Sequence, residues 1–365
     1  MKRFYVPNKY PNLIVKRSPL LIFIILSFFF STTQAQVGGR SVYTFLNITS
    51  SARLSGMGGN FAVIKDNDLS LALVNPSLIT PEMSNNLTLN YIKYFSDINY
   101  GFAAYSRTFP KIGSFTAGIQ YLNYGKFIQA DETGQTYGTF HAADYALQIG
   151  WGRSLDSSFS VGANLKMIFS DLDSYTSFGL CVDVAGTYFN RKRQMGVSLI
   201  ARNIGRQIVY YTAGNNEPLP FELQLAFSTR PKHLPFRLSI VLTHLERYNM
   251  RYTDPALPTT DPLTGEAIQT SKIGEIADNL MRHVVIGGEF IPIKALSIRL
   301  GYNYQRRKEM TVETRKGLTG FSFGIGLKIR NFSINYGRAM YHISGSPNVI
   351  TLTTDLGGFM KKVKK

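Results

Sequence analysis

Apolar and polar residues alternate one for one through most of the chain from Leu87 to Phe359. Across 159–169 every second residue is apolar, and the residues between them are small or polar. A repeat of two is that of a β-strand with one apolar face, and it differs from the repeat of about 3.6 of an amphipathic helix. The same alternation returns across 296–305 and 321–330. The chain is therefore predicted to be all-β.

The connections between the predicted strands alternate between short and long. The short ones are 110–113, 155–158, 190–194, 230–235, 292–294 and 330–331, and the long ones are 125–139, 205–220, 246–281, 306–317 and 342–349. Two links on the long side, 96–97 and 171–174, are short. Outer-membrane barrels combine short periplasmic turns, longer outer loops and an even strand number. We therefore predict a transmembrane antiparallel β-barrel of about 14 strands over residues 87–365, with both termini periplasmic.

A soluble β-sandwich is the alternative, because its strands also alternate. The polar face of this chain, however, consists mostly of Gly, Ser, Asn and Gln, which suit a crowded lumen. Aromatic residues also gather near strand ends, as Tyr100, Tyr105 and Phe109 do. Such residues form the interfacial girdles of membrane barrels. Both observations favour the membrane barrel.

The alternation also assigns the two faces of each strand. Leu165 and Leu300 are predicted to face lipid, and Asn164 and Asn303 to face the lumen. An Arg at either leucine should then cost roughly 2 to 4 kcal/mol at mid-membrane depth, and much less at either asparagine. A polar lumen also argues against a pathway for hydrophobic molecules.

The first 86 residues differ from the rest of the chain. An apolar block from Leu20 to Phe30 follows basic residues and precedes a small-residue site that ends at Ala35. This order is typical of a cleaved signal peptide over residues 1–35, with an uncleaved anchor helix as the alternative. Residues 36–86 are too many for a tail and too few for an ordinary domain. We predict that they form a hatch or plug in the periplasmic mouth, with a strand or two joined to the sheet as the alternative.

The chain is strongly basic, with 40 Lys and Arg against 23 Asp and Glu and a formal net charge of +17. No nucleic-acid-binding motif accompanies this charge, so the expected acidic partners are outer-membrane lipid, lipopolysaccharide or an acidic protein face. The five histidines lack metal-ligand spacing, and a nucleophile elbow is absent. We therefore expect no metal, no cofactor and no enzymatic activity. The single Cys181 has no partner for an internal disulfide.

The first candidate contact site is a basic cluster in the predicted outer loop 306–317. Its members are Arg306, Arg307, Lys308, Arg315 and Lys316. Guanidinium groups bind phosphates and carboxylates bidentately, so this loop could hold lipopolysaccharide or an acidic partner. The alternative is a solvated hairpin whose charges pair with Glu309 and Glu313.

The second candidate site lies in the longest predicted loop, 246–281. Turn-forming Pro and Gly residues are followed by a helical pattern, in which Lys272, Ile273 and Ile276 are candidate partner contacts. Long loops on a rigid scaffold commonly carry binding functions. A partner-docking lid is favoured over a merely flexible loop.

Several segments of the chain resemble the PorV/PorQ family of the type IX secretion system. They are 38–47, 51–60, 68–78, 90–101, 117–125 and 217–221, and the resemblance covers essentially the whole mature chain. The family looks like the FadL-type fatty-acid transporters, which are fourteen-stranded barrels with an N-terminal hatch that carries an Asn-Pro-Ala motif. In this chain the motif reads Asn75-Pro76-Ser77, which keeps Asn and Pro but replaces Ala.

The resemblance implies a place in a Bacteroidetes-type outer membrane, in a complex that attaches secreted cargo to lipopolysaccharide. It implies a PorZ-like surface protein as partner and, through it, PorU-like and PorV-like proteins, with the chemistry belonging to the sortase-like PorU. Two functions follow. The first is a structural anchor that binds a surface partner through its outer loops, which the polar lumen favours. The alternative is a FadL-like transporter of hydrophobic small molecules.

Overall fold

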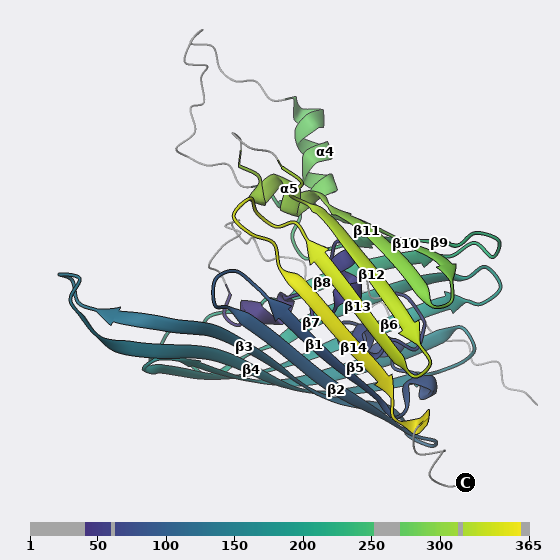
Figure 1. The fold of residues 1–365 in the computed structure, drawn as a ribbon, viewed down its shortest axis with the longest axis horizontal. Helices are drawn as coiled ribbons and strands as arrows, with labels where there is room; N and C mark the ends of the chain where they lie inside the picture. The colour runs from purple at the N-terminus through teal and green to yellow at the C-terminus, as the bar shows by residue number, and fades with distance from the viewer. Residues whose placement is uncertain (1–40, 60–62, 252–270, 313–316, 359–365) are drawn as a thin grey trace, which may run out of the picture. The chain divides into compact units, whose positions relative to one another are not determined.

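The computed structural model describes residues 41–59, 63–251, 271–312 and 317–358. Within this part of the chain, fourteen antiparallel strands form one closed barrel in which neighbours in sequence are neighbours in space (Figure 1). The barrel closes where β1 pairs with β14, for example Asn90 with Thr351. The strands are β1 (Asn86–Lys93), β2 (Asn99–Phe109), β3 (Gly113–Ala130), β4 (Thr136–Ser154), β5 (Phe159–Leu172), β6 (Tyr175–Asn190), β7 (Met195–Val209), β8 (Glu222–Thr229), β9 (Phe236–Leu242), β10 (Val284–Ile293), β11 (Leu296–Asn303), β12 (Phe321–Ile329), β13 (Phe332–Ala339) and β14 (Asn348–Asp355). The predicted fold class is confirmed.

The two ends of the barrel are distinguished by their connections. One end carries the connections that follow β2, β4, β6, β8, β10 and β12, together with the start of β1 and the end of β14. We call it the turn side. The other end carries the remaining connections, including 243–283 and 304–320, and we call it the loop side.

Alternate residues of the strands form an apolar outer belt. Leu165 is 41% exposed and Leu300 is 58% exposed, as the predicted faces require. Other exposed apolar residues of the belt are Leu89, Ile119, Leu147, Leu199, Leu225, Ile325, Ile334 and Ile350. A closed barrel leaves no strand edge unpaired, and an apolar belt is covered by lipid hydrocarbon. These two properties together fit a barrel that spans a membrane.

The inward face is buried, which changes one expectation. Asn164 is fully buried, and its Nδ2 donates to the Leu73 carbonyl at 3.2 Å. An Arg at this position has no room, so the small effect expected there is wrong. Asn303 has a different role again, because its Oδ1 accepts a hydrogen bond of 2.9 Å from the Arg306 backbone and caps a helix.

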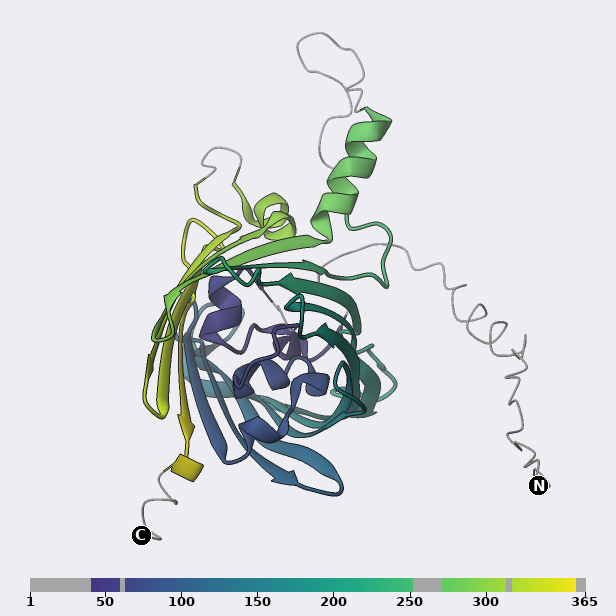
Figure 2. The ribbon, with the colours of Figure 1, turned by 90° about the vertical axis from the view of Figure 1, so that its right-hand side faces the viewer.

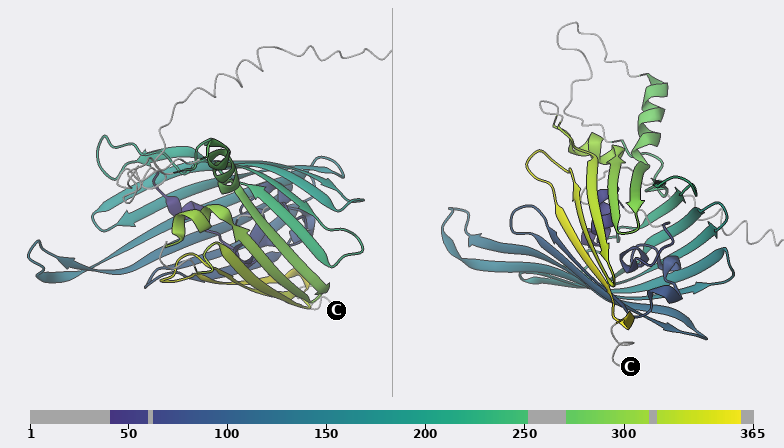
Figure 3. Two further views of the ribbon diagram at one scale, coloured as in Figure 1. Left: turned by 90° about the horizontal axis from the view of Figure 1, so that it is seen from above. Right: turned by 45° about the vertical axis from the view of Figure 1, so that its right-hand side comes forward.

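The strands of the β3 to β7 wall are longer than the alternation predicts. The expected loop 125–139 is mostly a hairpin, because β3 runs to Ala130 and β4 begins at Thr136. Its exposed strand ends, which include neighbouring apolar residues such as Phe127 and Ile128, lack the regular alternation of a lipid-facing strand. The rings of Phe127 and Phe140 stack across this hairpin at 5.1 Å between centroids. Figure 3 shows the hairpin extending past its neighbours on the loop side.

Two helices lie on the loop side. The helix α4 (Lys272–Arg282) confirms the helical pattern in the longest predicted loop. The helix α5 (Tyr304–Met310) replaces the start of the expected loop 306–317, and it begins where β11 ends, at Asn303. None of the helices in the described ranges is long and apolar enough to span a membrane.

The described part of the N-terminal segment lies inside the ring of strands (Figure 2). Its helices are η1 (Thr44–Asn47), α2 (Ala52–Gly56), α3 (Leu69–Ala72), η2 (Pro76–Leu78) and η3 (Pro81–Met83). The helix α2 contacts β11 to β14, η2 contacts β4 to β6, and α3 and η3 contact β2. The segment therefore touches opposite walls of the barrel and fills the lumen between them.

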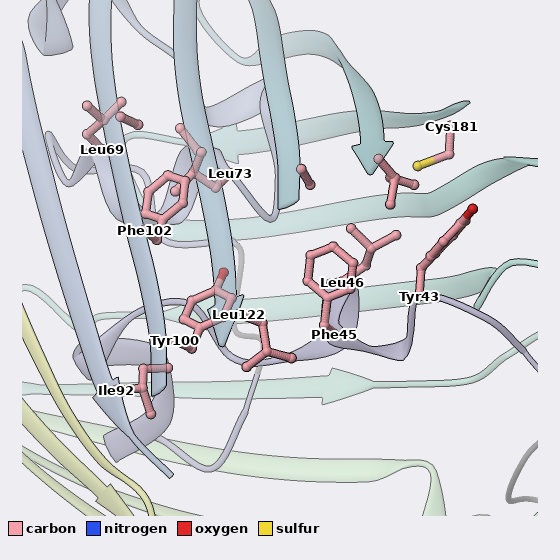
Figure 4. Close-up of a cluster of buried hydrophobic side chains, with 14 of the residues drawn as sticks. Tyr43, Phe45, Leu46, Leu69, Leu73, Ile92, Tyr100, Phe102, Leu122 and Cys181 are labelled. Carbon is pink, nitrogen blue, oxygen red and sulfur yellow. The ribbon is translucent and has the colours of Figure 1, made fainter. Parts of the chain in front are cut away.

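An apolar cluster joins the N-terminal segment to the β2 to β6 wall. Figure 4 shows Phe45 and Leu46 close to Tyr100 and Leu122, which come from β2 and β3. Tyr100 is fully buried, so the girdle position expected for it is wrong. The expectation of a polar lumen face holds only for part of the wall. Each such buried side chain contributes about 1.5 to 3 kcal/mol of hydrophobic stabilisation, so this contact holds the segment in place.

Candidate functional site

The Asn75-Pro76-Ser77 motif packs against the inner wall formed by β4, β5 and β6. Asn75 caps the short helix η2, with its Oδ1 accepting from the Ser77 backbone at 3.0 Å, and Pro76 occupies the first helical turn. Asn75 Nδ2 donates to Thr187 Oγ1 of β6 at 3.2 Å. The Ser77 hydroxyl lies 2.6 Å from the same threonine oxygen. The motif thus fixes the segment to the wall by polar contacts.

Glycines in the wall make room for the N-terminal segment. A Cβ atom on Gly162 of β5 would lie 2.3 Å from the Pro76 carbonyl. On the opposite wall, a Cβ atom on Gly301 of β11 would lie 2.0 Å from the carbonyl carbon of Met57, just after α2. Real Cβ atoms do not approach so closely. The inward-facing glycines therefore serve a close backbone contact with the segment.

A buried ion-pair cluster links the segment to the β9 to β11 wall. Glu289 of β10 is almost completely buried and receives three guanidinium groups: Arg53 of α2 at 2.9 Å, Arg237 of β9 at 2.6 Å and Arg299 of β11 at 2.8 Å. Arg53 also pairs with Asp66 at 2.7 Å and Asp68 at 3.1 Å. Each buried guanidinium group thus has a carboxylate that balances its positive charge, as buried charges require.

The alternation across 296–305 places Arg299 on the inward, polar face, but the rest of this cluster was not predicted. One signal was available, because Glu289 lies on the same alternating face of its strand as Val285 and Gly287. A carboxylate on an inward face needs a cationic partner. The partner Arg53 is far away in sequence and could not be chosen from the alternation.

A cavity of about 800 Å³ opens beside this cluster, at the turn-side mouth of the barrel. Its inner wall includes Glu289 and Arg299. Its outer margin includes the cations Arg230, Lys294, Lys328 and Arg330. Such a charged lining suits water and ions rather than a hydrophobic molecule.

A second polar cluster fixes α4 to the loop-side end. Asp278 Oδ2 accepts from Arg282 Nε at 2.9 Å, and Oδ1 accepts from the Tyr304 hydroxyl at 2.8 Å and lies 3.2 Å from Lys308 Nζ. Burial alone would raise the pKa of Asp278. The hydrogen bonds from Tyr304, Arg282 and Lys308 outweigh it and lower this pKa to about 2. The ionised carboxylate therefore joins α4 to α5.

The helix α4 turns its polar side toward the protein and its apolar side outward. Asn279 is buried, and it bonds the Tyr248 carbonyl at 2.6 Å and the Met250 amide at 2.8 Å. In contrast, Ile273, Ile276 and Leu280 are 80%, 54% and 56% exposed. These three positions follow the i, i+3, i+7 spacing of one helix face. We call them the α4 apolar row.

The structure separates the predicted basic cluster into residues with different surroundings. Arg306 lies over the Tyr341 ring at 4.1 Å and donates to the Gly58 carbonyl at 3.3 Å, so it contacts the N-terminal segment. Arg307 donates to the Gly317 carbonyl at 2.8 Å, and Lys308 pairs with Asp278. Arg315 and Lys316 lie outside the described residues. The described members thus make contacts within the protein, to the N-terminal segment, to α4 and to neighbouring residues of the same connection.

The remaining predicted contacts are Lys272, Ile273 and Ile276, all on α4. Lys272 is exposed at the start of this helix, and the two isoleucines belong to the α4 apolar row. The predicted signal peptide and its cleavage site lie outside the described residues. Within the described ranges, no group of three or more His, Cys, Asp or Glu residues could hold a metal ion.

The fold and its lumen define a closed membrane β-barrel that is filled by its own N-terminal segment. No family model matches the chain, and no curated protein matches it. Among solved structures it is similar to the Ralstonia pickettii toluene transporter TbuX, with 11% identity and a TM-score of 0.49 over 85% of this chain and 99% of that one. The Pseudomonas putida toluene transporter TodX gives 13% identity and a TM-score of 0.49 over 83% and 96%. A Pseudomonas aeruginosa FadL homologue gives 12% and 0.45 over 84% and 98%. At these identities and TM-scores the likeness carries no argument about ligand or partner.

Proposed function

We propose that this protein is a barrel of the bacterial outer membrane that holds a partner protein at the cell surface. The single observation that carries the proposal is the α4 apolar row, which no described residue covers. Because outer-membrane barrels have short periplasmic turns and longer outer loops, the loop side with α4 faces outward and both termini are periplasmic. A cleaved signal peptide over residues 1–35 delivers the chain to this membrane.

The α4 apolar row has the properties of a docking surface. Burial of one such side chain against a partner contributes about 1.5 to 3 kcal/mol, so the three together supply a substantial part of a binding free energy. Their spacing matches the anchors of a helix that binds in a groove. The Asp278 cluster holds the helix in place before a partner arrives, which lowers the entropic cost of binding.

The sequence resemblance supports a particular partner. We infer a PorZ-like surface protein with an apolar groove, and through it PorU-like and PorV-like proteins of a type IX secretion attachment complex. Lys272 beside the row adds a contact for an acidic partner or for lipopolysaccharide. The chain itself then holds the partner at the membrane and has neither catalytic activity nor a cofactor. Residues 36–86 serve as the hatch that keeps the lumen closed.

The test is a pull-down of the solubilised full chain that carries Ile273→Ser, Ile276→Ser and Leu280→Ser together. These side chains are exposed, so the barrel should fold normally, and capture of the surface partner should fall at least tenfold. The matched control replaces two other exposed loop-side apolar residues, Leu318→Ser and Ile343→Ser, and should capture the partner normally. Equal capture by both variants would overturn the docking role of α4.

A transporter of hydrophobic small molecules is the second candidate, and one observation favours it. A mostly apolar recess of about 420 Å³ lies in the β4 to β7 wall, lined by Tyr145, Phe169, Phe178 and Val209. This recess is on the outward face of the wall, where Phe169 and Val209 are 45% and 51% exposed, whereas the apolar cluster around Tyr100 is on the inward side. Two of the similar structures are named as toluene transporters.

Transport and docking predict different results in vesicles. A transporter should speed the entry of toluene into liposomes that contain the protein, and Phe169→Ala should change the rate because it alters the recess. If the protein only holds a partner, toluene should enter these liposomes at the rate measured for liposomes that contain the heat-unfolded protein. Accelerated entry by the α4 triple-serine variant, together with normal partner capture, would favour the transporter.

A further inference from the structure

The turn side carries a concentration of cations that its own structure does not neutralise. Its exposed members outside the cavity are Arg107, Lys111, Arg153, Arg191, Lys192, Arg193 and Lys232. We call them the cationic rim. They lie at the ends of β2 and β4 and in the connections that follow β2, β6 and β8. None of them makes an ion pair with a described residue.

Acidic residues are scarce in the same region. The six short connections and the strand ends beside them are all described, and Asp156 is the single acidic residue among them. The Asp156 carboxylate accepts from the backbone amides of Ser158 and Phe159 at 2.6 and 2.7 Å, so it stabilises its own turn. Glu82 and Asp355 face the cavity inside the mouth. Cations therefore outnumber carboxylates around the rim.

Lys65, a half-buried residue of the N-terminal segment, lies close enough to Arg191 of the rim for their charges to interact. Burial lowers the pKa of Lys65, and the nearby Arg191 lowers it further, while Glu82 and Asp156 oppose the shift.

Aromatic pairs place the cationic rim at the membrane surface. Phe109 pairs with Phe115 at 5.8 Å between ring centroids, and Phe159 pairs with Tyr188 at 4.8 Å. These outward pairs come just before the turns, where an aromatic girdle marks the boundary of the hydrocarbon. Lys111 and Arg191 follow within a few residues. The cations are thus at the depth of lipid headgroups.

We propose that the cationic rim binds the phosphate headgroups of anionic phospholipids in the leaflet that surrounds the turn side. Two features favour lipid over an acidic protein. The rim follows consecutive turns around the barrel rather than forming one patch, and Arg107 and Arg153 lie on the outward face of their strands. Guanidinium groups and ammonium groups both bind phosphate oxygens by charge-assisted hydrogen bonds.

The test uses the full chain in neutral detergent and a fluorescent phosphatidylglycerol as the probe. The variant Arg191→Gln, Lys192→Gln and Arg193→Gln removes three rim charges from one turn and should weaken binding about a hundredfold at low salt. The matched control, Lys93→Gln, Lys126→Gln and Arg206→Gln, removes three exposed cations from the loop side and should leave binding within about twofold. Fluorescent phosphatidylcholine should bind both variants and the unmodified chain equally.

Two results would overturn the proposal. One is an equal loss of phosphatidylglycerol binding in the rim variant and the loop-side control, which would mean that only total charge matters. The other is binding of soluble polyglutamate to the rim without binding of phosphatidylglycerol, which would assign the rim to an acidic protein. Partner capture through α4 is measured separately, so failure here leaves the proposed function untouched.

Discussion

The loop side and the turn side of the barrel differ in whether their charged side chains have partners of opposite charge. On the loop side, Asp278 joins Arg282, Tyr304 and Lys308, so charges hold helices in place. On the turn side, the buried cluster around Glu289 is fully paired, yet the cationic rim outside it has no acidic partner in the described chain. Paired charges stabilise a shape, whereas unpaired surface cations are available to an external anion.

The apolar residues of the two ends differ in the same way. Turn-side apolar residues such as Phe109 and Phe159 belong to the outward belt and are suited to lipid. On the loop side, the α4 apolar row lies on a helix outside the strands. The barrel fold therefore does not imply that lipid covers this row. One end is therefore adapted to the membrane, and the other presents a surface for a partner.

The largest effect is expected from Glu289→Gln, which tests whether paired charges are structural. Loss of this carboxylate leaves the guanidinium groups of Arg53, Arg237 and Arg299 undercompensated in a buried site. The free energy of unfolding should fall by about 3 to 5 kcal/mol. Urea unfolding in detergent measures it. The exposed carboxylate of Asp97 provides the control, because Asp97→Asn should change stability by at most about 0.5 kcal/mol. Equal effects would mean that the cluster is not structural.

A smaller and local effect is expected from Asp278→Asn on the loop side. The variant loses the charge that holds Arg282 and Lys308, so local opening of α4 should become easier by about 1 to 2 kcal/mol while the barrel stays intact. Hydrogen exchange of the α4 amides measures this opening. Glu132→Gln in the β3–β4 hairpin is the control. Unchanged α4 exchange would contradict the anchoring role of Asp278.

The pH dependence of α4 follows from the same residue. The pKa of Asp278 in the folded protein is about 2, below its ordinary value. A carboxyl group with a lowered folded pKa contributes stability above its unfolded pKa of about 3.9, and this contribution disappears as the pH falls toward 2. Carboxyl ¹³C NMR should therefore show Asp278 ionised at pH 3. Protonation near pH 4 would show that its hydrogen bonds do not lower the pKa.

The smallest effect on stability is expected at the cationic rim. The rim variant Arg191→Gln, Lys192→Gln and Arg193→Gln removes exposed charges without acidic partners, so the free energy of unfolding should change by no more than about 0.5 kcal/mol. Urea unfolding in neutral detergent checks this value. A loss of several kcal/mol would place the rim among the structural charges and remove the difference between the two ends.

The barrel wall could be predicted because its physics is local. A residue such as Leu165 faces lipid because of its parity in a strand, and parity is visible in the sequence. The β3–β4 hairpin was missed because its exposed ends need not be apolar on one face. Tyr100 was misplaced because an aromatic side chain suits both a girdle and a buried core.

The candidate site was harder to predict because it depends on distant contacts. Gly162 and Gly301 occupy positions that the alternation assigns to the small or polar face, but the segment that they accommodate lies 86 residues away at Pro76 in the first case and 244 residues away at Met57 in the second. Arg306 illustrates the same limit, since its ring contact with Tyr341 is set by the arrangement of two loops. In contrast, Ile273 and Ile276 were found from helical spacing alone.

The central claim is that the two ends of the barrel meet different partners, and photo-crosslinking in intact cells tests it most directly. A p-benzoylphenylalanine residue is introduced in separate variants as Ile276→p-benzoylphenylalanine on α4 and Lys192→p-benzoylphenylalanine on the rim. We expect one discrete protein adduct from position 276 and no comparable protein adduct from position 192. A protein adduct from position 192 together with none from position 276 would contradict the account.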